Sequence, residues 1–176
     1  VSGIAAPGSA RVIVAWTGHR PELFLDVDAA RAAVEQTAAE IMRSGRVQRF
    51  LVGGQRGVDT WAAEAALEHA VPFTLILPLP IGEFTAEWPA ADRERLERHT
   101  QRAEQVRVVG GPPAAAYAER NRLLAASADL LVAVWTGRRG GGTAETVDFA
   151  RQLGTRVREV RLPASAASAS ATGRGI

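Results

Sequence analysis

Short β-branched apolar runs alternate along the chain with Ala-rich segments of helical character. The apolar runs predict six strands, at residues 11–17, 49–54, 73–79, 106–110, 129–135 and 156–162. The segments between them predict helices near residues 28–44, 58–70, 90–104, 114–127 and 143–153. Continuous apolar strands separated by helices are typical of a parallel sheet that is covered on both faces. The pattern therefore predicts an α/β fold: a single doubly wound Rossmann-like domain whose mainly parallel sheet has about six strands, with helices on both faces.

The two ends of the chain are rich in Ala, Ser and Gly and contain few large apolar residues. We therefore expect a flexible N-terminus at residues 1–10, one domain over residues 11–163 and a flexible tail at residues 164–176. The first residues lack the basic start and the long apolar core of a signal peptide. No apolar run reaches the ~18 residues of a membrane span. These features predict a cytoplasmic protein without a membrane partner.

Composition excludes several kinds of chemistry. The chain of 176 residues has no Cys, which excludes disulfides, thiol catalysis and Cys-based metal sites. It also has no Lys, which excludes a P-loop and a Schiff-base mechanism. The three His are scattered without ligand spacing, so we expect no metal, and nothing in the sequence points to a cofactor. The net charge of only +2 does not favour nucleic-acid binding.

In a parallel sheet of this kind, ligands bind at the carboxyl ends of the strands. The first such end carries "TGHRP", in which Gly18 permits a turn and in which His19 and Arg20 are candidates for contact with an anion. The alternative is that His19 is structural or merely exposed, as a lone His in a loop commonly is. We retain all three residues as candidate ligand-binding residues.

The second strand end carries "GGQRGVD". Gly53, Gly54 and Gly57 allow a sharp turn and a close approach of the backbone to a ligand. Amides at the start of the following helix attract anions, and Asp59 is placed to cap that helix. The alternative is a tight strand-to-helix turn with a capping Asp and no ligand.

The fifth strand end carries "RRGGGTAET". Gly140, Gly141 and Gly142 precede Thr143, a natural N-cap, and Glu145 falls in the first turn of the helix. A glycine loop, a helix N-terminus and neighbouring arginines together predict a phosphate or sugar-phosphate site. The alternative is a flexible surface loop before a well-capped helix.

Upstream of that loop, "YAERNRLLAASAD" predicts a helix that carries Arg120 and Asn121. Periodicity alone also allows a solvated helix face on which Glu119 and Arg122 pair locally. The four tryptophans are expected to have mostly packing roles, which argues against a track of stacking aromatics for single-stranded nucleic acid.

Taken together, "TGHRP", "GGQRGVDTWAAEAAL" and "ERNRLLAASADLLVAVWTGRRGGGTAETVDFARQLG" resemble the SLOG superfamily of Rossmann-like proteins over roughly residues 11–160. Within it, the chain is most similar to the YspA/YpsA-like branch, and DprA and the LOG enzymes are more distant members. The resemblance implies binding of a nucleotide or a nucleotide-derived small molecule at the glycine-rich loops. It also implies a homodimer, by analogy with the LOG enzymes.

LOG enzymes hydrolyse the N-glycosidic bond of riboside monophosphates. Arg120 matches their functional arginine, Asn121 replaces their lysine, and Gly142 and Thr143 match their Gly-Thr pair. Their essential Glu corresponds to Thr146 here, while Glu145 lies one residue earlier, which is about 100° of helical rotation. Three hypotheses result: a nucleotide-binding protein, a LOG-like phosphoribohydrolase with Glu145 and Arg120 as catalytic residues, and a DprA-like single-strand nucleic-acid binder. We rank them in that order.

Overall fold

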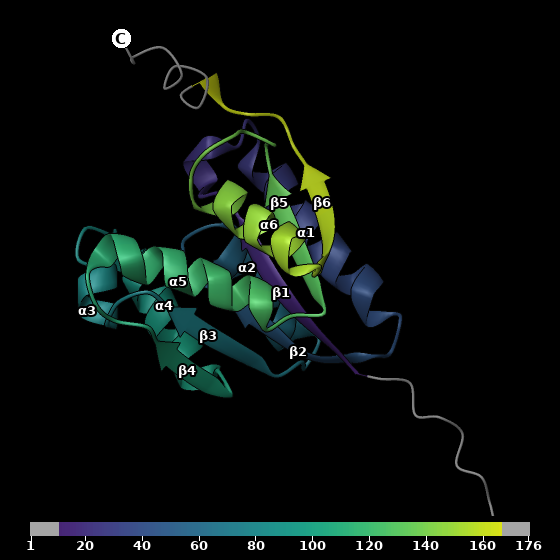
Figure 1. Cartoon of the computed structure of the whole chain (residues 1–176), viewed down its shortest axis with the longest axis horizontal. Helices are drawn as coiled ribbons and strands as arrows, with labels where there is room; N and C mark the ends of the chain where they lie inside the picture. Colours follow the sequence, from purple (N-terminus) through teal and green to yellow (C-terminus); the bar gives the residue numbers. More distant parts are fainter. Residues whose placement is uncertain (1–10, 167–176) are drawn as a thin grey trace, which may run out of the picture.

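The computed structural model describes residues 11–166 and shows one six-stranded sheet with helices on both faces (Figure 1). The strands are β1 (Val12–Gly18), β2 (Val47–Val52), β3 (Phe73–Leu77), β4 (Gln105–Val108), β5 (Leu130–Trp135) and β6 (Arg156–Arg161). The helices are η1 (Pro21–Leu23), α1 (Val27–Met42), α2 (Val58–Glu68), α3 (Ile81–Phe84), α4 (Ala90–Arg102), α5 (Pro113–Ala126) and α6 (Gly142–Leu153). The predicted fold class is confirmed, and the short η1 and α3 are additions to the predicted elements.

All five strand pairings are parallel, and the strand order is β4-β3-β2-β1-β5-β6. The chain therefore runs outward from β1 to the edge at β4 and returns to place β5 on the other side of β1. Helices α1 and α2 pack together on one face, and α5 and α6 pack together on the other, where Figure 1 shows them in front. The reversal of strand order lies between β1 and β5, the position at which open α/β sheets bind ligands.

Adjacent residues of the central strands are buried on opposite faces of the sheet. In β1, Trp16 belongs to the core beneath α1 and α2, whereas Ala15 belongs to the core beneath α5 and α6, and neither side chain is exposed. Because both faces are covered there, the inner strands β1, β3 and β5 are apolar at nearly every position, which explains the continuous apolar runs in the sequence.

The polypeptide after β6 returns to the first loop. The amide of Leu25 donates to the carbonyl of Pro163 at 3.0 Å, and Phe24 forms an antiparallel bridge with Ala164. Residues 164–166 were expected to belong to a flexible tail, and the structure describes them alongside residues 23–25. The remainder of the expected tail, residues 167–176, and the expected flexible N-terminus, residues 1–10, lie outside the described residues. Within residues 11–166, no helix has both the length and the apolar character that crossing a membrane requires.

Candidate functional site

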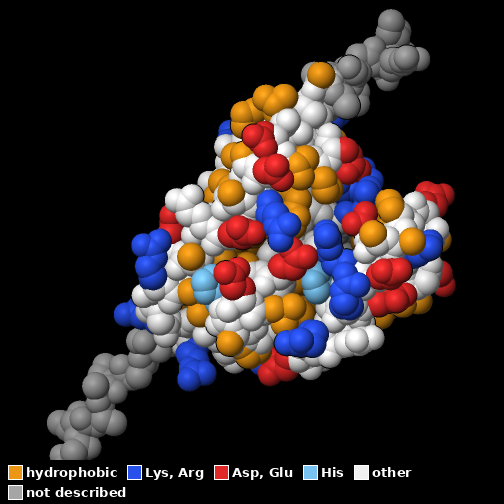
Figure 2. Space-filling model, turned by 180° about the vertical axis from the view of Figure 1, so that it is seen from behind, with side chains coloured by type: hydrophobic (Ala, Val, Ile, Leu, Met, Phe, Trp, Pro, Cys, Tyr) orange, Lys and Arg blue, Asp and Glu red, His pale blue; other side chains and the backbone are white. Residues whose placement is uncertain are grey.

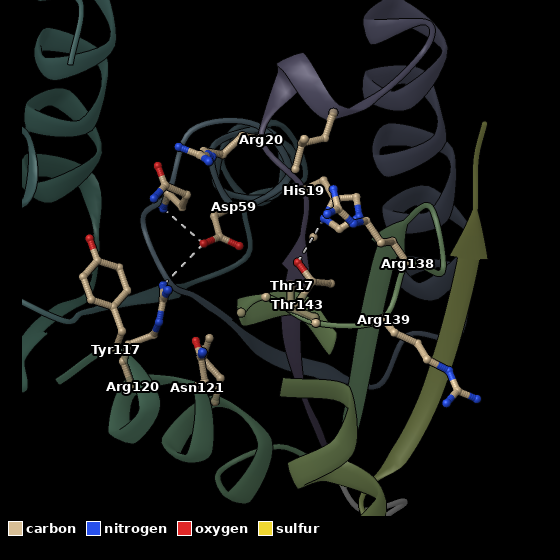
Figure 3. Close-up of a pocket in the computed structure, with 17 residues that line it drawn as sticks. Thr17, His19, Arg20, Asp59, Tyr117, Arg120, Asn121, Arg138, Arg139 and Thr143 are labelled. Atoms are coloured by element: carbon tan, nitrogen blue, oxygen red, sulfur yellow. Dashed lines mark hydrogen bonds and ion pairs between the residues drawn. The ribbon is translucent and has the colours of Figure 1, made fainter. Parts of the chain in front are cut away.

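A cavity of about 620 Å³ opens at the carboxyl ends of β1 and β5, where the strand order reverses (Figure 3). Its wall is built from the end of β1, the loop after it, the start of α2, one side of α5 and the loop between β5 and α6. The lining residues are Thr17, Gly18, His19, Arg20, Leu23, Gln55, Asp59, Tyr117, Arg120, Asn121, Leu124, Arg138, Arg139, Gly140, Gly141, Gly142 and Thr143. The topology thus brings residues from all four motifs into one wall. From the second motif, only Gln55 and Asp59 line the cavity.

The start of α6 faces this cavity and has no capping side chain among the described residues. Gly141 is the N-cap, and both Gly140 and Gly141 have positive φ angles, +82° and +83°, that favour glycine. The expectation that Thr143 caps the helix is wrong, because the helix begins one residue earlier, at Gly142. The first amides of α6 therefore remain available to a ligand.

The start of α2 is different, because its first amide and its buried carboxylate are already paired inside the protein. The amide of Val58 donates to the carbonyl of His19 at 3.3 Å, and the amide of Gln55 donates to the carboxylate of Asp59 at 3.1 Å. The expectation that Asp59 is the N-cap is also wrong: Gly57 occupies that position and Asp59 lies in the first turn. Its buried carboxylate is paired with the amide of Gln55 in the turn before the helix and with Arg120.

Gly53, Gly54 and Gly57, expected to cradle a phosphate, lie next to the cavity but do not line it. A Cβ at Gly53 would lie 1.8 Å from Nη1 of Arg120, and one at Gly54 would lie 2.5 Å from Cδ2 of Leu77. A Cβ at Gly57 would lie 2.5 Å from the carbonyl oxygen of His19. Close packing of the turn against its neighbours therefore accounts for all three glycines.

Arg120 is buried in α5, with only 7% of its surface exposed. Its Nη1 donates to the carbonyl of Gly53 at 2.7 Å and lies 3.6 Å from Oδ2 of Asp59 (Figure 3). Its Nε has no hydrogen-bond partner among residues 11–166. The solvated-face alternative holds only for the neighbouring pair of Glu119 and Arg122, which form the expected local ion pair at 2.9 Å.

Burial governs the charges of this pair. It raises the pKa of Asp59 to about 6, against the opposing effect of the Arg120 guanidinium and of two backbone hydrogen bonds. Burial likewise lowers the pKa of Arg120, while Asp59 acts in the opposite direction. Because an arginine starts from so high a value, Arg120 keeps its charge at neutral pH.

Asn121 and Glu145 meet beside the cavity. The Nδ2 of Asn121 donates to Oε2 of Glu145 at 2.8 Å, which ties α5 to the first turn of α6. Glu145 lines a second hollow of about 340 Å³ rather than the main cavity, and Arg120 and Asn121 belong to both walls. Thr146, at the place of the LOG glutamate, is fully buried and donates to the carbonyl of Gly142 at 2.7 Å.

His19 lies between two threonine hydroxyls, one from the loop after β5 and one from the first turn of α6. Its Nε2 is 3.0 Å from Oγ1 of Thr136, and its Nδ1 is 3.4 Å from Oγ1 of Thr143. Burial, together with the smaller effect of the positive charges of Arg138 and Arg20, lowers the pKa of His19 to about 4, so that the ring is neutral at pH 7.

Several wall residues were not predicted, notably Thr17, Gln55 and Tyr117. Each lies within three residues of a predicted site residue, but no pattern in the sequence marks it as part of a site. Figure 3 shows Arg138 beside His19, whereas the side chain of Arg139 extends away from the pair of Asp59 and Arg120.

Other possible sites are weaker. In the described part of the chain, no group of three or more His, Asp or Glu is placed to hold a metal ion. Trp16, Trp61 and Trp135 are at most 5% exposed, which confirms their packing roles. On the face shown in Figure 2, arginine and acidic side chains are interspersed rather than separated into an area of one sign.

The sequence and the fold are similar to those of known proteins. The family model of the YspA SLOG family matches residues 17–154. The UPF0398 protein OB1025 of Oceanobacillus iheyensis is 28% identical over 101 residues, which are 52% of this chain and 54% of that protein. The chain thus spans about half the length of this relative.

Solved structures share the fold at low identity. DprA of Streptococcus pneumoniae matches with a TM-score of 0.64 and 18% identity, over 85% of this chain and 50% of that one. The Moco carrier protein of Chlamydomonas reinhardtii matches with a TM-score of 0.58 and 21% identity, over 85% and 76%. The molybdenum cofactor binding protein of Rippkaea orientalis matches with a TM-score of 0.57 and 20% identity, over 88% and 78%. Since the family model covers most of the described domain, the chain belongs to the YspA SLOG family.

Proposed function

We propose that this protein binds a phosphate-bearing small molecule derived from a nucleotide, with the phosphate at the start of α6. One observation carries the proposal: an uncapped helix N-terminus opens into a cavity lined by four arginines. The aligned peptide dipoles place about half a positive charge at such a terminus, and its free amides donate to anions. Gly140, Gly141, Gly142 and Thr143 form this terminus and the loop before it.

Arg120 supports the proposal independently. The side chain is more than nine-tenths buried, lines the cavity, and keeps an Nε that has no partner within residues 11–166. A buried donor without an acceptor is costly, and a ligand oxygen is one way to satisfy it. Arg20, Arg138 and the neutral ring of His19 would complete the polar wall around the phosphate.

The size of the cavity and the relatives support a ligand larger than a bare ion. Cavities of about 300–1,000 Å³ are typical of small-molecule sites, and the main cavity falls within that range. Two proteins with this fold are named for their handling of the molybdenum cofactor, so the fold is compatible with a small-molecule ligand. The family resemblance directs the proposal to nucleotide-derived ligands.

Calorimetry of the full chain against AMP, adenosine and inorganic phosphate tests the proposal. We expect AMP to bind and adenosine to bind at least about tenfold more weakly, since a charge-assisted hydrogen bond contributes about 1.5–3 kcal/mol. Gly142→Asp puts a carboxylate in the first turn of α6, which favours the helix by about 0.3–1 kcal/mol but repels a phosphate. We therefore expect that variant to fold and to lose AMP binding.

Gly82→Asp is the matched control, because it adds the same charge near the start of the short α3, where a Cβ meets no described atom within 4 Å. It should bind AMP like the unchanged protein. Equal binding of AMP and adenosine, or unchanged binding in Gly142→Asp, would contradict the proposal.

Turnover is not part of the proposal. Glu145 is bonded to Asn121 and lies in the smaller hollow, and Thr146 is buried against its own helix, so no carboxylate of α6 lines the main cavity. The LOG-like hypothesis keeps its direct assay: release of free base from nucleoside monophosphates, lost in Glu145→Gln. A homodimer and a cytoplasmic location also stay predictions, and light scattering of the purified chain tests the first of them.

A further inference from the structure

One side of the main cavity carries no net charge. The guanidinium of Arg120 and the carboxylate of Asp59 lie there 3.6 Å apart, so their opposite charges offset each other. The backbone amide of Gln55 donates to the same carboxylate at 3.1 Å, and Asn121 follows Arg120 in α5. Figure 3 shows Asp59, Arg120 and Asn121 on the side of the cavity away from His19. We call Gln55, Asp59, Arg120 and Asn121 the neutral wall.

Asn121 presents a hydrogen-bond acceptor on this wall. Its side chain lines both hollows, although the residue is only 3% exposed. Its Nδ2 donates to Oε2 of Glu145 at 2.8 Å, and because a carboxylate oxygen accepts, the carboxamide is held in this orientation. The remaining atom, Oδ1, has no hydrogen-bond partner among residues 11–166 and is open to the cavity. An acceptor left without a donor in a buried position is costly, and a donor on a ligand recovers that cost.

Gln55 presents a donor on the same wall. Its Oε1 accepts from the backbone amide of Arg56 at 2.9 Å, and because a backbone amide can only donate, the carboxamide of Gln55 is also held in one orientation. Its Nε2 has no hydrogen-bond partner within the described residues, and Gln55 lines the cavity. The neutral wall therefore offers one acceptor and one donor whose types are set before any ligand binds.

We infer that the neutral wall binds an uncharged part of the ligand that carries both a donor, for Oδ1 of Asn121, and an acceptor, for Nε2 of Gln55. A nucleobase has this combination on one edge, as the amino group and N7 of adenine illustrate. A second anionic group would find no net positive charge on this wall, because Asp59 offsets Arg120. The inference rests on the proposed function and deepens it: the phosphate binds at α6, and Asn121 and Gln55 select the base.

Calorimetry of the full chain with four phosphate-bearing compounds tests the inference: AMP, IMP, purine riboside 5′-monophosphate and ribose 5-phosphate. We expect the tighter-binding of AMP and IMP to exceed ribose 5-phosphate in affinity at least about tenfold, since two hydrogen bonds to the base are added. Purine riboside 5′-monophosphate keeps the ring and N7 but lacks the donor at position 6. It should bind at least about fivefold more weakly than the tighter of AMP and IMP, because Oδ1 of Asn121 is then unpaired.

Two variants and a control assign the effect to the neutral wall. Asn121→Leu should bind purine riboside 5′-monophosphate and the tighter nucleotide equally, because the acceptor is gone. Gln55→Met should lower the affinity for that nucleotide about fivefold and leave the affinity for ribose 5-phosphate unchanged. Gln101→Met makes the same substitution as Gln55→Met on the exposed surface of α4 and should alter neither preference.

The outcomes separate this inference from the proposed function. Equal affinity for purine riboside 5′-monophosphate and for the tighter of AMP and IMP would overturn the inference, and so would equal affinity for ribose 5-phosphate. In both cases the phosphate site would stand. Binding of none of the four compounds would overturn the proposed function as well. Thermal unfolding checks that Asn121→Leu is folded; a folded variant that keeps the full preference would show that Asn121 does not select the base, and the ligand series decides the inference if the variant does not fold.

Discussion

Removing the guanidinium of Arg120 should strongly destabilise the fold, because it leaves the carboxylate of Asp59 buried without a cation. The two residues are only 7% and 5% exposed, and Nη1 lies 3.6 Å from Oδ2. Breaking one side of such a buried pair costs about 3–5 kcal/mol. For a chain of this length each kcal/mol lowers the midpoint of thermal unfolding by about 2–4 °C, so Arg120→Met should lower it by about 6–20 °C at pH 7.

The effect of Arg120→Met should depend on pH with a defined sign. Arg120 lowers the pKa of Asp59, so its loss moves that pKa further above about 6, while the unfolded value stays near 3.8. At a pH between the unfolded and the folded pKa, Asp59 is protonated in the folded state and ionised in the unfolded state. The free energy of unfolding therefore falls as the pH rises through this interval. The variant should be closer to the unchanged protein at pH 5 than at pH 7.

Urea and thermal unfolding of a double-mutant cycle provide the measurement. Adding Asp59→Asn to Arg120→Met removes the orphaned charge and should recover most of the lost stability at pH 7. Arg122→Met, two residues further along α5, breaks an exposed ion pair with a shorter distance of 2.9 Å and should cause no resolved shift. The reasoning fails if Arg122→Met costs as much as Arg120→Met, or if Asp59→Asn adds to the loss.

Two further predictions concern stability. Gly18→Ala should cost about 1–3 kcal/mol in urea unfolding, because its Cβ would lie 2.4 Å from the carbonyl oxygen of Val134; Gly82→Ala, in open space, should cost nothing, and equal losses would contradict this. Burial lowers the folded-state pKa of His19 and of His99 to about 4 from 6.5, so the unfolded state binds more protons in that interval and stability should rise from pH 4 to 6.5. In His99→Gln, the unfolding midpoint should rise less steeply between pH 4 and 6.5. An unchanged slope of the unfolding midpoint against pH would refute this prediction.

Much of the fold was predictable, because the signals are local and repeated. Strands buried on both faces must be apolar at successive positions, as Ala15 and Trp16 illustrate, and such runs are visible without any tertiary information. The general location of the site was predictable for a related reason: parallel strands end at one edge, so the loops after β1, β2 and β5 must lie close together.

The details at the two helix starts were not predictable. Asp59 and Thr143 both have the residue type and position of an N-cap, yet neither caps its helix. Asp59 is instead held by Arg120 from α5, and Thr143 lies 3.4 Å from a ring nitrogen of His19 from the loop after β1. Both partners are far away in the sequence, and one residue of difference in where a helix begins changes what its first side chains contact.

The sequence by itself determined the fold class, the approximate elements and the edge of the sheet at which polar residues gather, since each depends on residue type repeated at short spacing. Only the tertiary structure decided which glycine loop is open to a ligand. Gly53 lies against Arg120, and the first amide of its helix, that of Val58, donates to the carbonyl of His19, whereas Gly140 and Gly141 border a cavity and precede an uncapped helix. The physical reason is that a hydrogen-bonding group is available to a ligand only when no other part of the folded chain has already paired with it.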